Sequence, residues 1–338
     1  MKYRNFGNTG LQISEIVFGA GAVGGAVFRG ERHARLEAVR KALENGINWI
    51  DTAANYGDGQ SEENLGWILR QLGAVPHIST KVSIGEAHLN DIPGEIERSM
   101  EASLRRLQRS SVDLIQLHTP VTSSRGQFRG SISLEDVLGP NGVLEGFERL
   151  RNRGLVRFFG FTGFGDTACL HQMIESGRLH SVQAYYNMLN PSAGRPVPSG
   201  FAAHDYENLI DLAAAKGVAV LNIRVLAAGA IVGQEPPGGG EGLSPGSGAV
   251  EDMARGARLR KALEELHIQG STAQTAIRFG LMHPGVSGVL VGFAMPEHID
   301  EAVAAVEMGP LPDPMSMALD DLYATDFGLS REPQEAGQ

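Results

Sequence analysis

The chain has 338 residues and a single cysteine, Cys169. One thiol cannot build an intramolecular disulfide framework or a cysteine-rich metal site. No apolar run is long enough to cross a membrane, and residues 1–6 lack the apolar core of a signal peptide. The sequence therefore predicts a cytoplasmic protein that has no membrane partner.

Positive charge is also scarce, because 29 lysines and arginines stand against 39 acidic residues, giving a net charge of −10. This balance argues against nucleic acid or an anionic membrane surface as a partner. The length suits one α/β barrel of about 250 residues with insertions. We expect a single barrel domain over residues 1–310, followed by a C-terminal segment, 311–338, that is partly helical and then flexible.

A strand followed by a helix recurs about eight times after an N-terminal hairpin of residues 2–6 and 12–14. The strands are expected at 15–18, 48–51, 77–81, 112–118, 156–162, 181–184, 218–223 and 288–291. The helices are expected at 31–45, 61–72, 92–107, 143–152, 167–176, 205–216, 250–267, 272–283 and 296–308. Ser61 is expected as an imperfect cap of the second helix, and a long polar loop is expected between the strand at 112–118 and the helix at 143–152. The pattern predicts an α/β fold, a (β/α)8 TIM barrel with an N-terminal β-hairpin and extended loops at the C-terminal face.

Three polar residues end successive expected strands: Asp51, Lys81 and His118. In a chain of βα units the carboxyl ends of the strands meet at one mouth, where catalytic residues gather. Tyr56 follows Asp51 on the loop that overhangs the same mouth. Alone, each residue has a structural explanation, such as a turn cap or a core histidine. Their joint position predicts one shared site.

These four side-chain types suit proton transfer to or from a carbonyl oxygen. A free phenol titrates near 10, and a neighbouring ammonium stabilises its phenolate form. A carboxylate holds the ammonium in place, while an imidazole can donate a hydrogen bond to the carbonyl. No side chain in this set can supply a hydride, so a nicotinamide cofactor is implied.

A glycine-rich motif points to a different fold. Residues 19–24 read G-x-G-x-x-G after a short strand, as in a Rossmann dinucleotide site. Such a site needs a helix at the turn, whereas residues 25–30 intervene here before any helical pattern. A Rossmann-type dehydrogenase stays an alternative. We expect instead a flexible first βα loop with accessible backbone groups, including those of Gly21 and Ala22.

The run D-T-A-A-N-Y-G at residues 51–57, followed by Ser61 and Glu62, resembles the signature of the aldo-keto reductase family. Residues 113–118 match the family's D-L-x-x-x-H strand, and the resemblance extends over about residues 1–310. It implies a (β/α)8 barrel and NAD(P)H-dependent reduction of an aldehyde or ketone, or oxidation of an alcohol or sugar.

The resemblance also implies a role for each catalytic residue. Tyr56 would be the general acid/base, Lys81 its activator, Asp51 the partner of the lysine, and His118 the donor that orients the carbonyl. The implied cofactor contacts are Gly21, Ala22, Asp51, Thr162, Gln183, Arg224, Leu226, Gly229, Gly292, His298 and Glu301.

Several of these positions depart from the family pattern. Thr162-Gly163 stands where the family has Ser-Asn. Arg224 replaces a serine, and it could contact the cofactor pyrophosphate, contact an anionic substrate, or form a structural ion pair. Thr119 stands where an aromatic residue is common after the catalytic histidine, which suggests a more polar or roomier pocket.

The 2′-phosphate clamp of the family is also changed. Its lysine, serine and arginine positions are Gly292, Phe293 and His298 here, and its Glu-Asn pair becomes Glu301 and Ala302. An imidazole grips phosphate less firmly than a guanidinium. We therefore predict NADP(H) binding with weak discrimination against NAD(H), tighter when His298 is protonated.

The sequence leaves some questions open. The substrate is a small carbonyl compound or sugar, with aldoses, small aldehydes, ketosteroid-like ketones and quinones all allowed, and the oligomeric state is open. A redox sensor or regulatory subunit, similar to the potassium-channel β-subunit branch of the fold, is the alternative function. Residues 233–248 could be a mobile element over the mouth or a solvated insertion.

Overall fold

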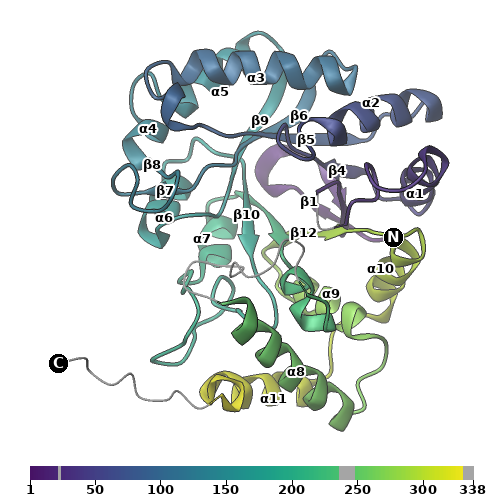
Figure 1. Ribbon diagram of the computed structural model, residues 1–338. Coiled ribbons are helices and arrows are strands. Elements are labelled where there is room, and N and C mark those ends of the chain that lie inside the picture. Colours follow the sequence, from purple (N-terminus) through teal and green to yellow (C-terminus); the bar gives the residue numbers. More distant parts are fainter. Residues whose placement is uncertain (22–23, 236–247, 330–338) are drawn as a thin grey trace.

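The computed structural model describes residues 1–21, 24–235 and 248–329. Eight parallel strands close into a barrel in the order β10-β11-β12-β3-β4-β5-β6-β9, which confirms the expected (β/α)8 fold (Figure 1). The barrel strands are β3 (Ile16–Gly19), β4 (Trp49–Asp51), β5 (His77–Val82), β6 (Val112–Leu117), β9 (Val156–Thr162), β10 (Ser181–Tyr185), β11 (Ala219–Ile223) and β12 (Val286–Gly292).

Helices surround the strands, and most begin within a few residues of the expected positions. The barrel helices are α1 (Arg32–Glu44), α2 (Gln60–Leu72), α3 (Ile92–Leu107), α5 (Val143–Asn152), α6 (Thr167–Glu175), α7 (Leu209–Ala215), α9 (Thr272–Met282) and α10 (Glu297–Met308). In α3 the side chains of Ile92, Ile96, Met100 and Leu104 are buried at every fourth position. This spacing puts one apolar stripe against the barrel.

The N-terminal hairpin closes one end of the barrel. Strands β1 (Tyr3–Asn5) and β2 (Gln12–Ser14) pair antiparallel around a short turn, η1 (Gly7–Thr9). Phe6 packs on Trp49 inside the barrel, with ring centroids 4.6 Å apart. A Cβ on Gly7 would lie 2.5 Å from the carbonyl oxygen of Gly217, so only glycine allows this approach. The plugged end is the one where the strands begin, which leaves the opposite end for a site.

Three local expectations are wrong. The expected loop after β6 contains β7 (Val121–Thr122), β8 (Ile132–Ser133) and α4 (Leu134–Leu138). Two-residue strands carry no readable period, so the pattern missed them. The helix expected at 205–216 begins only at Leu209, because Glu207 and Asn208 have φ of 50° and 58°, outside the helical region.

The third correction concerns the start of α2. Ser61 was expected to cap this helix, but Gly59 precedes it and no side chain caps it. The Ser61 hydroxyl instead donates to the carbonyl of Ala20 at 2.9 Å and pairs with the Thr52 hydroxyl at 2.8 Å. It therefore ties the first two βα loops together under the mouth.

The Rossmann alternative is wrong, because the parallel sheet closes into a barrel. The glycine-rich run enters the first βα loop, and α1 begins only at Arg32. A Cβ on Gly24 would lie 2.4 Å from the backbone nitrogen of Phe293, and the Ala26 N–H donates to the Phe293 carbonyl at 3.0 Å. The missing side chain at Gly24 lets the first loop pack against the end of β12.

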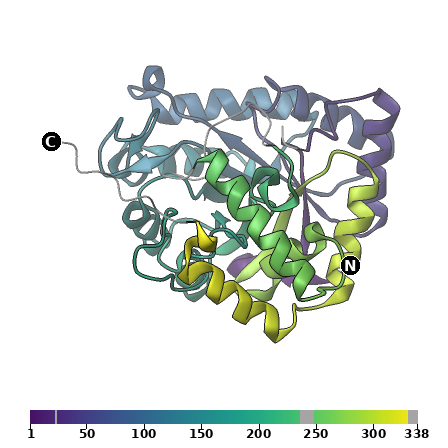
Figure 2. The same cartoon turned by 60° about the horizontal axis from the view of Figure 1, so that its bottom comes forward.

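Beyond the barrel helices, α8 (Ala249–Glu265) and α11 (Asp313–Ala324) lie side by side (Figures 1 and 2). Arg255 of α8 donates to Asp326 at 2.9 Å in the short turn η4 (Asp326–Gly328), which joins α8 to the segment that follows α11. Residues 330–338 and 236–247, where flexibility was expected, lie outside the described residues. In the described part of the chain no helix is long and apolar enough to cross a membrane.

Candidate active site

A cavity of about 680 Å³ opens at the end of the barrel where the strands finish. The residues predicted to form the site converge on it from seven of the eight barrel strands or the segments after them. Its lining includes Gly21, Asp51, Tyr56, His118, Thr162, Gln183, Arg224, Leu226, Gly229, Gly292, His298 and Glu301. Ala22 lies outside the described residues.

Lys81 lies beneath the cavity and does not line it. Its side chain is buried, and its ammonium donates to Asp51 Oδ2 at 2.5 Å, the Thr52 carbonyl at 3.0 Å and Tyr56 Oη at 3.1 Å. Burial lowers the pKa of Lys81, but the Asp51 carboxylate and the Tyr56 hydroxyl oxygen together more than offset this, so the pKa is raised. The ammonium therefore stays charged directly under the phenol.

The Asp51 carboxylate is held by more groups than the sequence indicated. Its Oδ1 accepts hydrogen bonds from Ser79 Oγ at 2.7 Å, Gln116 Nε2 at 3.0 Å and Gln183 Nε2 at 2.8 Å. Ser79 and Gln116 stand two residues before Lys81 and His118, so strand alternation turns them to the same interior face. The alternation of side chains along a strand can be read from the sequence and would have identified Ser79 and Gln116.

The Tyr56 and His118 rings meet edge to face, with centroids 5.8 Å apart. His118 directly follows β6, and its backbone N–H donates to the Val82 carbonyl at 2.8 Å. Burial, together with the charges of Lys81 and Arg224, lowers the pKa of His118 to about 3. The imidazole is therefore neutral at physiological pH and offers one N–H donor to the cavity.

This pKa makes stability depend on pH. Between about pH 3 and 6.5 an unfolded His118 binds a proton that the folded protein excludes. The free energy of unfolding should therefore fall as the pH is lowered through this window. We expect the free energy of unfolding of His118→Gln, measured with urea, to fall less steeply with decreasing pH than that of wild type. His33→Gln, which alters an exposed imidazole, should keep the wild-type slope; equal slopes in all three proteins would contradict the buried neutral histidine.

An aromatic residue does lie beside His118, although the position that directly follows this histidine is occupied by Thr119. Thr119 is buried, and its hydroxyl accepts from the Ile84 N–H at 2.7 Å and donates to the Ile84 carbonyl at 3.3 Å. The polar pocket inferred from Thr119 is therefore wrong, because that hydroxyl holds two loops together. Phe164 lines the cavity instead, with its ring centroid 6.2 Å from that of His118.

The other end of the cavity is built from two helix N-termini. Ser271 and Thr272 begin α9, and His298 lies in the first turn of α10. The Ser271 hydroxyl donates to Glu301 at 2.5 Å while also capping α9 through Gln274. Among the described residues at this end, His298 is the only basic side chain. Sequence reasoning missed Ser271, although its S-x-x-Q capping box was readable.

Comparison with known proteins agrees with this architecture. The sequence model of the Aldo/keto reductase family matches residues 15–324. L-galactose dehydrogenase of Arabidopsis thaliana is 25% identical over 90% of this chain and 88% of its own. A probable voltage-gated potassium channel subunit beta from Arabidopsis thaliana is 26% identical, covering 93% and 94%. An aldo/keto reductase from Klebsiella pneumoniae, solved with NADP and acetate, superposes with a TM-score of 0.67 at 22% identity over 96% of both chains.

The family match covers nearly the whole barrel, including all of the segments that carry Asp51, Tyr56, Lys81 and His118. The closed barrel of parallel strands is also the fold of the solved reductase. The chain belongs to the aldo/keto reductase family.

Proposed function

We propose that the protein is an NAD(P)H-dependent oxidoreductase that reduces an aldehyde or ketone, or oxidises the corresponding alcohol or sugar, with Tyr56 as general acid/base. One observation carries the proposal. The Lys81 ammonium, fixed on Asp51, lies 3.1 Å from the Tyr56 hydroxyl at the floor of a large cavity. A positive charge at this distance stabilises the phenolate that remains when the hydroxyl transfers its proton to a substrate.

Each polar group then has a defined task during carbonyl reduction. The neutral His118 imidazole donates a hydrogen bond to the carbonyl oxygen and orients it. As negative charge grows on that oxygen, Tyr56 transfers its hydroxyl proton to it. Lys81 stabilises the phenolate left behind, and Asp51 keeps the ammonium in place. Ser79, Gln116 and Gln183 fix the carboxylate, so the set is preorganised before substrate binds.

The cavity suits a dinucleotide cofactor. It extends from Tyr56 to the N-termini of α9 and α10, and these ends favour phosphate groups. Gly21 keeps the wall thin beside Tyr56, because a Cβ there would lie 3.3 Å from the tyrosine ring. Thr162 and Gln183 offer hydroxyl and amide groups to a carboxamide near the catalytic end. A bound reduced nicotinamide supplies the hydride that no side chain here can give.

A substrate survey tests this proposal. Purified protein is mixed with NADPH or NADH and a panel of aldehydes, ketones, quinones and sugars, and the nicotinamide absorbance is followed. We expect turnover of at least one carbonyl class with a matching amount of alcohol. Tight nucleotide binding without turnover of any panel member would contradict an enzyme.

The second candidate is a nicotinamide-binding redox sensor or regulatory subunit. It is favoured by the similarity to a potassium channel subunit beta, since a complete catalytic set can serve a slow sensor. Turnover separates the two functions. A sensor binds nucleotide tightly and reduces carbonyl compounds very slowly, whereas an enzyme releases product and continues.

Cofactor preference gives a further prediction. The adenosine end offers His298 and two helix N-termini to a 2′-phosphate, with Glu301 close by. We expect both NADP(H) and NAD(H) to bind, with NADP(H) preferred only weakly, because an imidazole grips a phosphate less firmly than a guanidinium. Dissociation constants for both nucleotides, measured by fluorescence titration, check this.

The control variant is His298→Ala, which should weaken NADP(H) binding and leave NAD(H) binding nearly unchanged. A preference for NADP(H) above about 100-fold that survives this substitution would mean that other groups hold the 2′-phosphate.

A further inference from the structure

Arg224 stands out among the side chains that line the cavity. Of the described lining residues, it alone carries a permanent positive charge. No carboxylate in the described part of the chain forms an ion pair with it, whereas Arg106 and Arg125 are paired with Glu62 and Asp136. The structural ion pair considered from the sequence is therefore absent from the described residues. A guanidinium that faces a cavity and has no carboxylate partner among the described residues is suited to an anionic ligand.

The backbone at Arg224 is held in an unusual conformation. Its φ is 58°, in the left-handed region that non-glycine residues rarely occupy. The side chain of Asn187 fixes this turn, because its Nδ2 donates to the Arg224 carbonyl at 3.0 Å. Asn187 is itself fixed, since its Oδ1 accepts from the N–H groups of Leu189 and Asn190 at 2.9 and 3.0 Å. Strained positions held this firmly tend to occur at functional sites.

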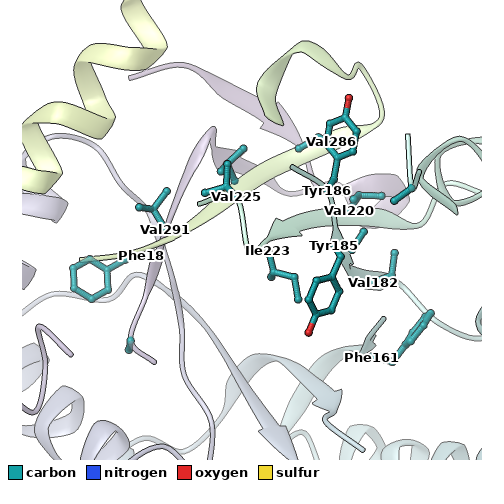
Figure 3. Packing of buried hydrophobic residues seen from close by; sticks show 14 of the residues in the cluster. Phe18, Phe161, Val182, Tyr185, Tyr186, Val220, Ile223, Val225, Val286 and Val291 are labelled. Atoms are coloured by element: carbon teal, nitrogen blue, oxygen red, sulfur yellow. The ribbon is translucent and has the colours of Figure 1, made fainter. Parts of the chain in front are cut away.

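A second polar group lies beside this arginine. Tyr185, which ends β10, pairs in register with Ile223, the residue before Arg224. Figure 3 shows the Tyr185 and Ile223 side chains on the same side of the strands, with Tyr186 on the other. The Arg224 guanidinium carbon lies 6.0 Å from the centroid of the Tyr185 ring.

The Tyr185 hydroxyl is buried and donates no hydrogen bond within the described residues. Burial raises the pKa of Tyr185 well above its usual value, and the Arg224 charge only partly opposes this. The phenol is therefore neutral. The described lining of the cavity does not include Tyr185, so this residue packs behind Arg224 and positions the guanidinium.

Arg224 faces the reacting groups, because it lines the cavity together with Tyr56 and His118, and its charge contributes to the lowered pKa of His118. Tyr185 packs on Phe164 with centroids 5.3 Å apart, Phe164 lies 6.2 Å from His118, and His118 lies 5.8 Å from Tyr56. This row of rings connects Tyr185 with the proton donor. The 2′-phosphate candidates, His298 and Glu301, lie on α10 at the other end of the cavity.

We propose that Arg224, positioned by Tyr185, binds a carboxylate of the substrate, so that the preferred substrates are oxo acids, aldehydes or ketones that carry a carboxylate group. The proposal rests on the carbonyl reduction proposed above. A guanidinium can give a carboxylate two parallel hydrogen bonds. The cofactor pyrophosphate is the other anion of matching chemistry, and the experiment must separate the two sources.

Succinic semialdehyde and butanal form a matched substrate pair, because they share a four-carbon aldehyde chain and differ by the carboxylate. We expect wild type to have the higher kcat/KM for the acid. Arg224→Met should lower kcat/KM for the acid about 10- to 100-fold more than for butanal, mainly through KM. Tyr185→Phe should lower the same ratio by a smaller factor. Lys216 directly follows α7, at the end of the barrel that the N-terminal hairpin closes. Lys216→Met removes this distant positive charge and should leave the ratio of the two kcat/KM values as in wild type.

The affinity for NADPH shows whether Arg224 binds the substrate carboxylate or the cofactor pyrophosphate. If Arg224→Met weakens NADPH binding and lowers kcat/KM for both aldehydes equally, Arg224 holds the pyrophosphate and the proposal is overturned. If wild type reduces neither aldehyde, succinate titrated into the NADP⁺ complex replaces turnover as the readout, while the substrate survey decides the proposed function separately. Succinate binding that is lost in Arg224→Met supports the anchor, whereas equal binding in both proteins overturns it.

Discussion

Replacing Tyr56 with phenylalanine should lower kcat for carbonyl reduction about 100-fold or more, while the dissociation constant for NADPH stays nearly unchanged. The substitution removes one hydroxyl, the group that lies 3.1 Å from the Lys81 ammonium. The ring itself remains to line the cavity. Steady-state kinetics and a fluorescence titration of NADPH give the two quantities.

The control for this experiment is Tyr3→Phe, which removes a hydroxyl from an exposed tyrosine on the N-terminal hairpin. It should keep wild-type turnover. If Tyr56→Phe retained more than about a tenth of wild-type kcat, with the chemical step shown to limit the rate, another group would have to donate the proton.

Lys81→Met should damage both activity and stability. Turnover should fall about 100-fold or more, because the phenolate at Tyr56 loses the charge that stabilises it. The free energy of unfolding should fall by about 3 to 5 kcal/mol, because the buried Asp51 carboxylate loses its ion-pair partner. Both side chains are at most 2% exposed, so water cannot replace the missing partner. Urea unfolding and steady-state kinetics measure the two effects.

A double variant separates these two effects. In Asp51→Asn/Lys81→Met both charges are gone, and the amide oxygen of asparagine can still accept two of the three hydrogen bonds made to Oδ1. We expect the double variant to recover much of the lost stability and none of the lost activity. If the stability loss of the double variant equalled the sum of the losses in Asp51→Asn and Lys81→Met, the two residues would not form a coupled buried pair.

The fold could be predicted from the sequence because each βα unit carries its own signals. A buried strand, a polar strand end and an amphipathic helix such as α3 repeat along the chain, and only a barrel uses all eight units. The errors occur where local signals are weak. Strands β7 and β8 have two residues each, and the start of α7 is set by two positive φ angles that no side-chain pattern announces.

The site also contains residues that could be predicted from the sequence and residues that could not. Asp51, Lys81 and His118 were readable because strand ends converge in a barrel. Tyr56 was readable through the loop that follows β4. The partners of these residues depend on contacts between strands, and Thr119 shows the limit of position alone. It directly follows His118, yet its hydroxyl binds the backbone of Ile84. Which side chains turn into a cavity is decided by packing across the barrel.

The most direct test of this account follows the hydride and the proton donor together. Wild type and Tyr56→Phe are each mixed with NADPH that carries deuterium at the transferable position and with a carbonyl compound from the panel. The alcohol is then analysed by mass spectrometry. The account predicts one deuterium per alcohol formed by wild type and almost no labelled alcohol from Tyr56→Phe over the same time. Labelled alcohol at equal rates from both proteins, or none from wild type with saturating nucleotide, would contradict it.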